Sequence, residues 1–146
     1  MQYVVCGELT KMQYEQLLKF ALTYSHAFGV SSFRTRKKDL SATYFTFFQE
    51  MAPYAKDLYQ YSLPQHYERG QKFWIYELNA LGKKYLCRCE SFWDWALPEL
   101  PEDLSFFRHK KIWLNCITHE KMIIVISEVP NLLSFIEGLG IKMRVL

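Results

Sequence analysis

The stretch IWLNCITHEKMIIVIS, residues 112–127, contains two short apolar runs separated by the polar tetrapeptide Thr118-His119-Glu120-Lys121. Both runs, residues 112–117 and 122–127, are rich in β-branched side chains, which favour extended backbone. The tetrapeptide has a length that a hairpin connection commonly takes. We therefore predict an antiparallel hairpin with the His-Glu pair at its tip.

Further extended segments are predicted on both sides of this hairpin. Residues 72–78 and 84–88 together are rich in aromatic and β-branched side chains and flank Asn79-Ala-Leu-Gly82, which predicts a second hairpin closed by that loop. Residues 2–6 predict a short strand, and residues 141–145 alternate apolar with basic side chains, as a half-buried closing strand does. Together these segments indicate a mainly antiparallel sheet.

Helical periodicity dominates the first half of the chain. Thr10 and Gln13 form a capping-box pattern at the start of a helix, and Gly29 is suited to the left-handed conformation that ends one. A second helical pattern covers residues 44–61, where Pro53 predicts a kink or a break because it removes a backbone donor. The predicted core-facing side of the first helix consists of Tyr14, Leu17, Leu18, Ala21, Ser25 and Phe28.

The order of these elements indicates the fold class. Residues 131–138 add a short predicted helix before the closing strand. Helices in the first half and a meander of strands in the second predict an α+β protein, with N-terminal helices packed on a mainly antiparallel sheet. A length of 146 residues matches one globular domain, residues 1–146, with a sizeable core.

Composition and cysteine content indicate a compartment. Half of the residues are hydrophobic, yet the longest apolar run, Met122 to Ile126, is far too short to span a bilayer. The N-terminus has no basic region or apolar stretch typical of a signal peptide. The four cysteines are not needed as disulfides in a chain of this size, so we expect them to be reduced and mostly buried. We therefore expect a cytoplasmic protein.

Positive charge is concentrated in one segment. Arg34, Arg36, Lys37 and Lys38 with Asp39 carry 4 − 1 = +3, which equals the formal net charge of the whole chain. Such a loop can attract phosphates, and aromatic neighbours can stack on single-stranded bases. Nucleic-acid-binding domains usually carry a broader excess of positive charge, so a solvated loop or an acidic protein partner is favoured over weak nucleic-acid binding.

Five sequence features follow one another between residues 92 and 120. They are Trp95, the Leu-Pro-Glu-Asp-Leu sequence from Leu100 to Leu104, the pair Phe106-Phe107, Trp113 and the pair His119-Glu120. In this order the chain resembles a family of small uncharacterised bacterial proteins, some of which carry a sporulation-related label. The resemblance implies a bacterial, cytosolic protein and assigns no catalytic role to any residue.

The same block contains the parts of an acid–base site. Glu102, Asp103, His119 and Glu120 supply carboxylates and a side chain that titrates near neutral pH, with His119 as the candidate base. The alternative is structural: the two acids follow Pro101 at the predicted start of a helical turn, where carboxylates accept backbone amides. Since the chain also has no Gly-x-Ser-x-Gly, P-loop, dinucleotide or His-Glu-x-x-His motif, the structural interpretation is favoured and a small enzyme remains an alternative.

Metal binding is a weaker alternative. Cys87 and Cys89 would share one face of a strand, where they could meet Cys116 or His119 from the neighbouring hairpin. Structural zinc sites usually offer paired Cys-x2-4-Cys or His-x3-5-His spacings, which this chain lacks. We therefore expect core cysteines, with no metal and no cofactor.

Large aromatic side chains suggest a binding surface. Trp93, Trp95 and Trp113, together with Arg108, are residue types enriched where proteins meet partners, although large rings also fill cores. The leading hypothesis is a non-catalytic binding protein, of regulatory or immunity type, that engages an unidentified protein partner. Its contact surface would be the segment from Trp93 to Arg108 with the His119 turn, and no membrane would be involved.

Overall fold

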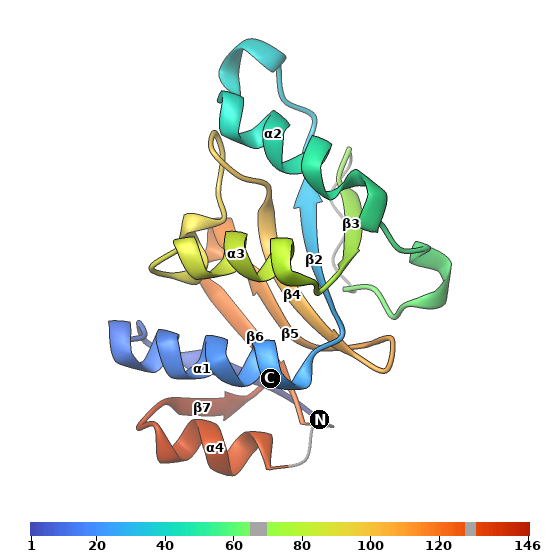
Figure 1. Ribbon diagram of the computed structural model, residues 1–146. Helices are drawn as coiled ribbons and strands as arrows, with labels where there is room; N and C mark the ends of the chain where they lie inside the picture. The colour runs from blue at the N-terminus through green and yellow to red at the C-terminus, as the bar shows by residue number, and fades with distance from the viewer. Residues whose placement is uncertain (65–69, 128–130) are drawn as a thin grey trace.

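The computed structural model describes residues 1–64, 70–127 and 131–146, and a seven-stranded antiparallel sheet forms its centre (Figure 1). The strands follow the order β3-β2-β4-β5-β6-β1-β7, so the N-terminal strand lies between β6 and β7. The strands are β1 (Gln2–Cys6), β2 (Ala27–Ser32), β3 (Lys72–Glu77), β4 (Glu102–Arg108), β5 (Lys111–Ile117), β6 (Met122–Ile126) and β7 (Lys142–Val145).

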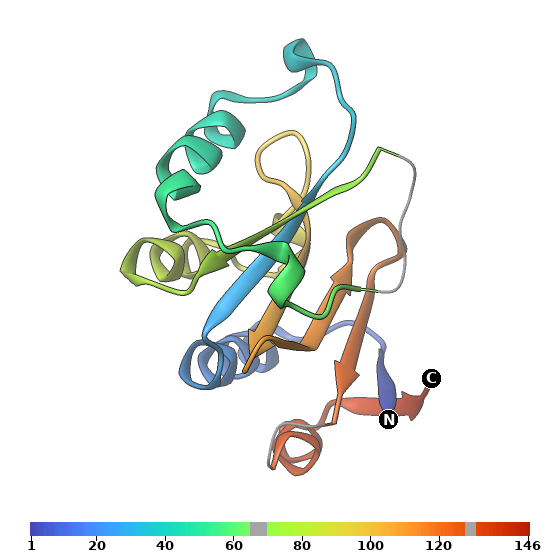
Figure 2. The same ribbon diagram turned by 90° about the vertical axis from the view of Figure 1, so that its right-hand side faces the viewer.

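Helices cover one face of the sheet. They are α1 (Lys11–Tyr24), α2 (Ala42–Met51), α3 (Ala80–Arg88) and α4 (Leu132–Gly138). Figures 1 and 2 show α1, α2 and α3 on the same side of the central strands. This arrangement confirms the predicted α+β class, with helices packed on an antiparallel sheet. Within the described ranges, no helix combines the length and the apolar character that crossing a bilayer requires.

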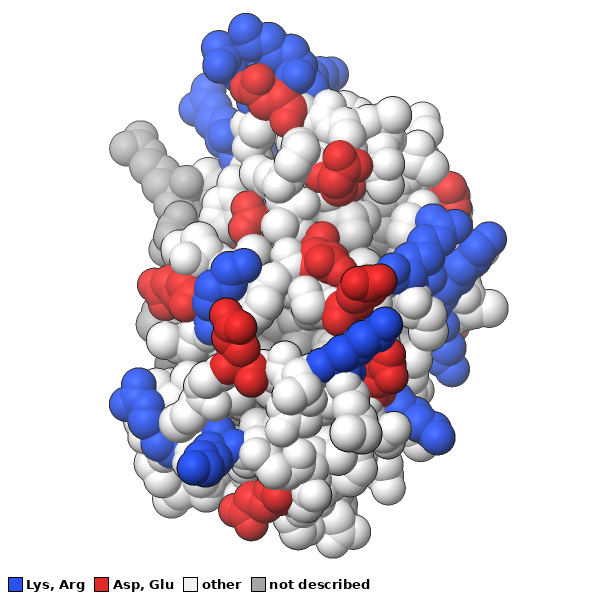
Figure 3. All heavy atoms as spheres, turned by 90° about the vertical axis from the view of Figure 1, so that its left-hand side faces the viewer, with Lys and Arg blue, Asp and Glu red and all other residues white. Residues whose placement is uncertain are grey.

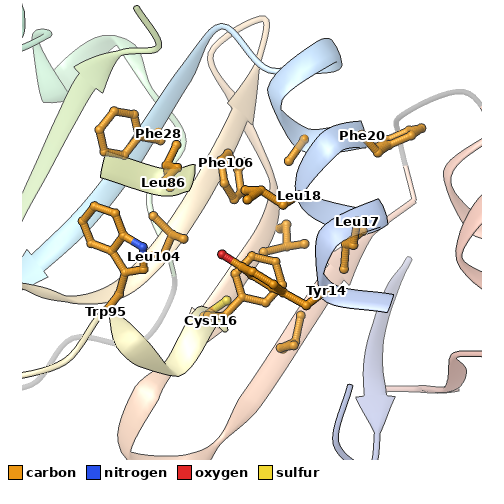
Figure 4. Packing of buried hydrophobic residues seen from close by; sticks show 14 of the residues in the cluster. Tyr14, Leu17, Leu18, Phe20, Phe28, Leu86, Trp95, Leu104, Phe106 and Cys116 are labelled. Atoms are coloured by element: carbon orange, nitrogen blue, oxygen red, sulfur yellow. The ribbon is translucent and has the colours of Figure 1, made fainter. Parts of the chain in front are cut away.

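The main core lies between these helices and the sheet. Figure 4 shows Leu17 and Leu18 of α1 and Leu86 of α3 facing Leu104 and Phe106 of β4. Burial of each large apolar side chain contributes roughly 1.5–3 kcal/mol, so this layer is the chief source of stability. The layer also includes polar contacts, because the Trp113 indole N–H donates a hydrogen bond to Ser25 Oγ at 2.9 Å.

A smaller cluster lies on the opposite face of the sheet. Ala27, Ile75, Phe107 and Ile112 form its buried centre. Side chains of the segment after α2 pack against it, among them Leu58, Tyr61 and Leu63. This segment covers only part of the second face.

Several predicted elements are confirmed. The N-terminal strand, the hairpin of β5 and β6, the short helix near the C-terminus and the closing strand all form where the sequence indicates them. The break at Pro53 also forms, because α2 ends at Met51 and a 3₁₀ turn, Ala52–Tyr54, follows. These are the elements whose pattern is local and regular.

The first helix is shorter than predicted. It ends at Tyr24, and Phe28 and Gly29 lie in β2. Because β2 lies between β3 and β4, it is buried on both faces and has no alternating pattern to reveal it. Gly29 is needed for close strand contact, since an added Cβ would lie 2.6 Å from Ser105 Oγ and 2.9 Å from a ring carbon of Phe107.

The predicted second hairpin is wrong. Residues 84–88 belong to helix α3, and the expected loop residue Asn79 is its N-cap, whose side-chain oxygen accepts the Gly82 N–H at 2.8 Å. Leu81, Tyr85 and Leu86 follow helical spacing and pack into the main core. Their burial therefore overrides the strand preference of the local composition.

The predicted helical turn at Glu102 and Asp103 is also wrong. Glu102 begins β4, and Asp103 adopts a left-handed backbone conformation with φ of 54°. The pairing of β4 with β2 shifts register at this point, as a β-bulge does. The bulge allows Asp103, a residue type that is rare in strands, to lie within β4. Residue propensities alone therefore do not predict this strand.

The contact at Gly29 gives a stability prediction. Gly29→Ala should lower the free energy of unfolding by about 1–3 kcal/mol, because the methyl group overpacks the contact between β2 and β4. Gly138→Ala is the matched control, since an added Cβ there has no neighbour within 4 Å and alanine favours the helix. Urea unfolding of both variants measures the difference. Equal stability of the two variants would contradict the close contact.

Candidate functional site

A cavity of about 490 Å³ opens between the start of α1 and the segment that follows α3. We call it the Trp93 cavity. Three parts of the chain that are distant in sequence meet there: the connection from β1 to α1, the turn after α3, and the β5–β6 turn with the start of β6. Its lining residues are Val5, Gly7, Glu8, Leu9, Thr10, Lys11, Tyr14, Glu90, Ser91, Phe92, Trp93, Lys121 and Ile123.

Hydrogen bonds within a short turn hold Trp93 in the wall of this cavity. Ser91 Oγ accepts the Trp93 N–H at 3.2 Å. Asp94 Oδ2 accepts the backbone N–H groups of Glu90 at 2.7 Å and of Ser91 at 3.2 Å. This capping box fixes the 3₁₀ turn Phe92–Asp94, so the indole of Trp93 is held half-exposed.

The cavity has an apolar floor and a charged rim. Tyr14 and Phe92 meet edge to face in the floor, with ring centroids 4.9 Å apart. Burial, above all, raises the pKa of the Tyr14 phenol, so this hydroxyl stays neutral. The Lys121 ammonium lies 5.3 Å from the centroid of the Trp93 ring, a cation–π distance. Glu8, Lys11 and Glu90 complete an exposed rim of both signs.

A second cavity, of about 520 Å³, lies on the sheet face opposite α1 and α3. We call it the Asp103 cavity. Asp103, His119 and Glu120 line it together with Asn115 and Gln71. The structure therefore brings three of the four predicted acid–base residues around one cavity, and Glu102 is not among its lining residues. His119 Nε2 lies 4.0 Å from Glu120 Oε1, and both side chains are about half exposed.

Asp103 and Thr118 form a reciprocal pair of buried hydrogen bonds. Asp103 Oδ1 accepts the Thr118 N–H at 2.8 Å, and the Asp103 N–H donates to Thr118 Oγ1 at 3.0 Å. The Thr118 hydroxyl in turn donates to the Trp95 carbonyl oxygen at 3.3 Å. The second carboxylate oxygen, Asp103 Oδ2, accepts from Gln71 Nε2 at 3.4 Å. The carboxylate therefore anchors the β5–β6 turn to the start of β4.

Buried polar side chains extend from Asp103 across the sheet. Ser105 of β4 pairs across the strands with Asn115 of β5 and with Gly29 of β2. Ser31 Oγ accepts a hydrogen bond from Gln71 Nε2 at 2.9 Å. Ser31, Ser105 and Asn115 are all buried, so a group of polar residues lies on this face beside the apolar cluster of Phe107 and Ile112.

Two of the predicted binding tryptophans do not reach the surface. Trp95 is 0% exposed and Trp113 is 1% exposed, because both rings fill the core between helices and sheet. Trp93 alone of the three is partly accessible. Arg108 lies apart from Trp93. It ends β4, and its guanidinium lies 5.2 Å from the ring centroid of Tyr24, at the opposite end of α1 from the Trp93 cavity. The predicted contact surface therefore reduces to Trp93 and the β5–β6 turn.

The predicted basic segment forms an exposed loop between β2 and α2. Arg36 Nε pairs with Asp39 Oδ2 at 3.1 Å, and Lys37–Asp39 form a 3₁₀ turn. Figure 3 shows Lys and Arg side chains gathered at the top of the molecule, over this loop. On the rest of that face, basic and acidic side chains are interspersed.

The prediction that the cysteines are mostly buried is wrong. All four are free, and only Cys116 is fully buried, whereas Cys6 and Cys87 are exposed. Burial, followed by the nearby charge of Asp94, raises the pKa of the Cys89 thiol to about 12. Burial also raises the pKa of Cys116, and the charge of Asp103 adds to this effect. Among the described residues, no group of three or more His, Cys, Asp or Glu side chains is arranged to hold a metal ion.

No protein-family model matches this chain, and no curated protein or solved structure shows significant similarity to it. The resemblance of residues 92–120 to a bacterial family therefore stays a prediction from sequence. The two cavities have to be interpreted from their own chemistry.

The Asp103–Thr118 pair gives the second prediction. Thr118→Ala should lower the free energy of unfolding by about 1–3 kcal/mol, because the buried Asp103 N–H loses its acceptor. Thr118→Ser keeps the hydroxyl and should cost only about 0.8 kcal/mol for the lost methyl group. Chemical denaturation separates the two variants. Equal losses would mean that methyl packing, and not the hydrogen bonds, holds the turn.

The cysteine environments give a third prediction. At pH 8 a thiol with a pKa near 12 is ionised to only about one part in ten thousand, so Cys89 should not react with Ellman's reagent in the native protein. Buried Cys116 should be equally inert, and only Cys6 and Cys87 should react. A Cys6→Ser/Cys87→Ser double variant should show no fast phase until denaturant is added. A fast-reacting thiol in that variant would contradict the described burial.

Proposed function

We propose that this protein is a non-catalytic binding protein that receives an apolar side chain of a protein partner in the Trp93 cavity. The observation that carries the proposal is the half-exposed indole of Trp93, held by a capping box in the wall of an open cavity. Within this class of binding proteins, we propose a regulatory or immunity-type role.

The construction of the cavity supports an anchoring role. Protein interfaces draw most of their binding energy from a few large side chains seated in preformed pockets. Ser91 and Asp94 fix the backbone of the turn, and the Trp93 ring packs against the main core and Lys121, so little side-chain freedom is lost when a partner docks. The floor beneath it is formed by the rings of Tyr14 and Phe92, which offer an apolar surface for one inserted side chain.

The rim supports specificity. Two acidic residues, Glu8 and Glu90, and two basic residues, Lys11 and Lys121, surround the apolar floor. Exposed charges of both signs contribute little affinity, but they discriminate between partners through repulsion of the wrong charge pattern. The partner surface that fits is therefore an apolar side chain flanked by charged groups of both signs.

Acid–base chemistry in the Asp103 cavity is the second candidate function. The observation in its favour is that Asp103 and His119 line the same cavity. The binding role is preferred because one carboxylate oxygen of Asp103 is committed to the Thr118 backbone and anchors the fold.

The binding proposal is tested by affinity capture from a lysate of the source organism with matched variants. Wild type and Trp74→Ala, which removes an exposed tryptophan elsewhere, should retain the same stoichiometric protein. Trp93→Ala should reduce the affinity for that protein by roughly 30-fold or more, the effect of losing about 2 kcal/mol at an interface anchor. Lys121→Glu should weaken it as well, through the altered rim charge.

Two controls keep this test decisive. Circular dichroism and urea unfolding show whether Trp93→Ala remains folded, and Lys121→Glu leaves the indole in place. His119→Ala should retain the partner, because His119 lines the other cavity. Equal capture by wild type, Trp93→Ala and Lys121→Glu, or the absence of any stoichiometric protein, would refute the proposal.

A further inference from the structure

A row of aromatic side chains runs along α2 and β3, and the rings at its two ends, Phe45 and Trp74, are exposed. Trp74 of β3 is 37% exposed and Phe45 of α2 is 39% exposed, which is unusual for rings of this size. Ring contacts link them in a chain: Trp74 to Phe48 with centroids 5.3 Å apart, Phe48 to Tyr44 at 5.1 Å, and Tyr44 to Phe45 at 5.7 Å. We call this row the aromatic strip.

The exposed rings are held in place. The Trp74 indole N–H donates to Ser32 Oγ at 2.9 Å, which ties the ring to the end of β2. Phe48 contacts the Trp74 ring and also packs against the buried Phe47. The ring centroids of Phe47 and Phe48 are 5.3 Å apart. The strip is therefore a fixed platform, and its open ring surfaces need no rearrangement to accept a flat ligand.

Positive charges border this platform. Lys72 pairs with Ser32 across the strands and lies two residues from Trp74 on the same strand face. Arg34 lies close to Gly70, two residues before β3. A Cβ added at Gly70 would be 3.5 Å from the Cβ of Arg34. Among described residues, Arg34, Lys37, Lys38 and Lys72 form no ion pair, whereas Arg36 is bound to Asp39.

We propose that the aromatic strip with its basic border is a binding site for single-stranded nucleic acid. Bases stack on exposed aromatic rings, and phosphates are attracted by the lysines and arginines beside them. The chain's excess charge lies in the segment that follows β2, and Arg34 of this segment lies close to Gly70, just before β3, which places a phosphate contact near Trp74. This inference is independent of the function proposed for the Trp93 cavity.

Nucleic acid fits this surface better than an acidic peptide does. A peptide carboxylate would satisfy Arg34 or Lys72, but most acidic segments have no flat group to cover the two exposed rings. Every base presents a π face, and stacking is tolerant of sequence, so a rigid pair of rings suits single strands in particular. The small number of cations indicates weak, salt-sensitive binding.

Titration of the protein with a mixed-sequence single-stranded DNA of about 12 nucleotides tests the proposal, with tryptophan fluorescence and anisotropy as readouts. Wild type should bind with a slope of log K against log salt of about −2 to −3, the value for three or four neutralised phosphates. Trp74→Ala should weaken binding about tenfold. Arg34→Gln combined with Lys72→Gln should weaken it and reduce the slope by about 1.4.

Two matched variants sharpen the result. Asp39→Asn frees the Arg36 guanidinium and should strengthen binding. Trp93→Phe, which alters the other partly exposed tryptophan, should bind as wild type does. The proposal is overturned by any of three results: no binding at low salt, undiminished binding by both Trp74→Ala and the Arg34/Lys72 double variant, or binding of a polyglutamate peptide without binding of DNA.

Discussion

The buried hydrogen-bond pair between Asp103 and Thr118 is the constraint on which the candidate sites depend. It joins the start of β4 to the turn that follows β5, and the Thr118 hydroxyl extends it to the backbone of Trp95. Because buried polar groups are costly unless paired, the three segments are held in one arrangement. The Trp93 cavity opens on one side of this junction and the Asp103 cavity on the other.

The sheet separates two kinds of chemistry. Its helical face is filled by large rings such as Trp95 and Trp113, which leave no room for a ligand. The opposite face carries the polar residues Ser105 and Asn115, and the segment after α2 covers only part of it. Surfaces suited to partners consequently lie at the margins of the helical layer, where Trp93 and Trp74 are accessible at separate places. The two proposed ligands would therefore occupy different surfaces.

Local patterns in the sequence predict the elements that depend on local interactions. The capping box at Thr10 and the hairpin around residues 112–127 are recognisable because their determinants lie within a few residues. Gly29 and Asp103 were misassigned because their conformations are set by a neighbouring strand. The Trp93 cavity could not be derived either, since it requires β1 to lie beside β6. The Ser91–Asp94 capping pattern was the one local signal that could have located the turn carrying Trp93.

The position of β1 inside the sheet has a consequence for how the molecule is assembled. β1 pairs with β6 on one side and with β7 on the other, so among the described strands it alone joins β7 to the rest of the sheet. Contacts between residues so distant in sequence carry a high entropic cost and form slowly. β1 thus pairs with segments that are more than 100 positions away in the sequence, and the wall that it supplies to the Trp93 cavity forms only when β6 is in place beside it.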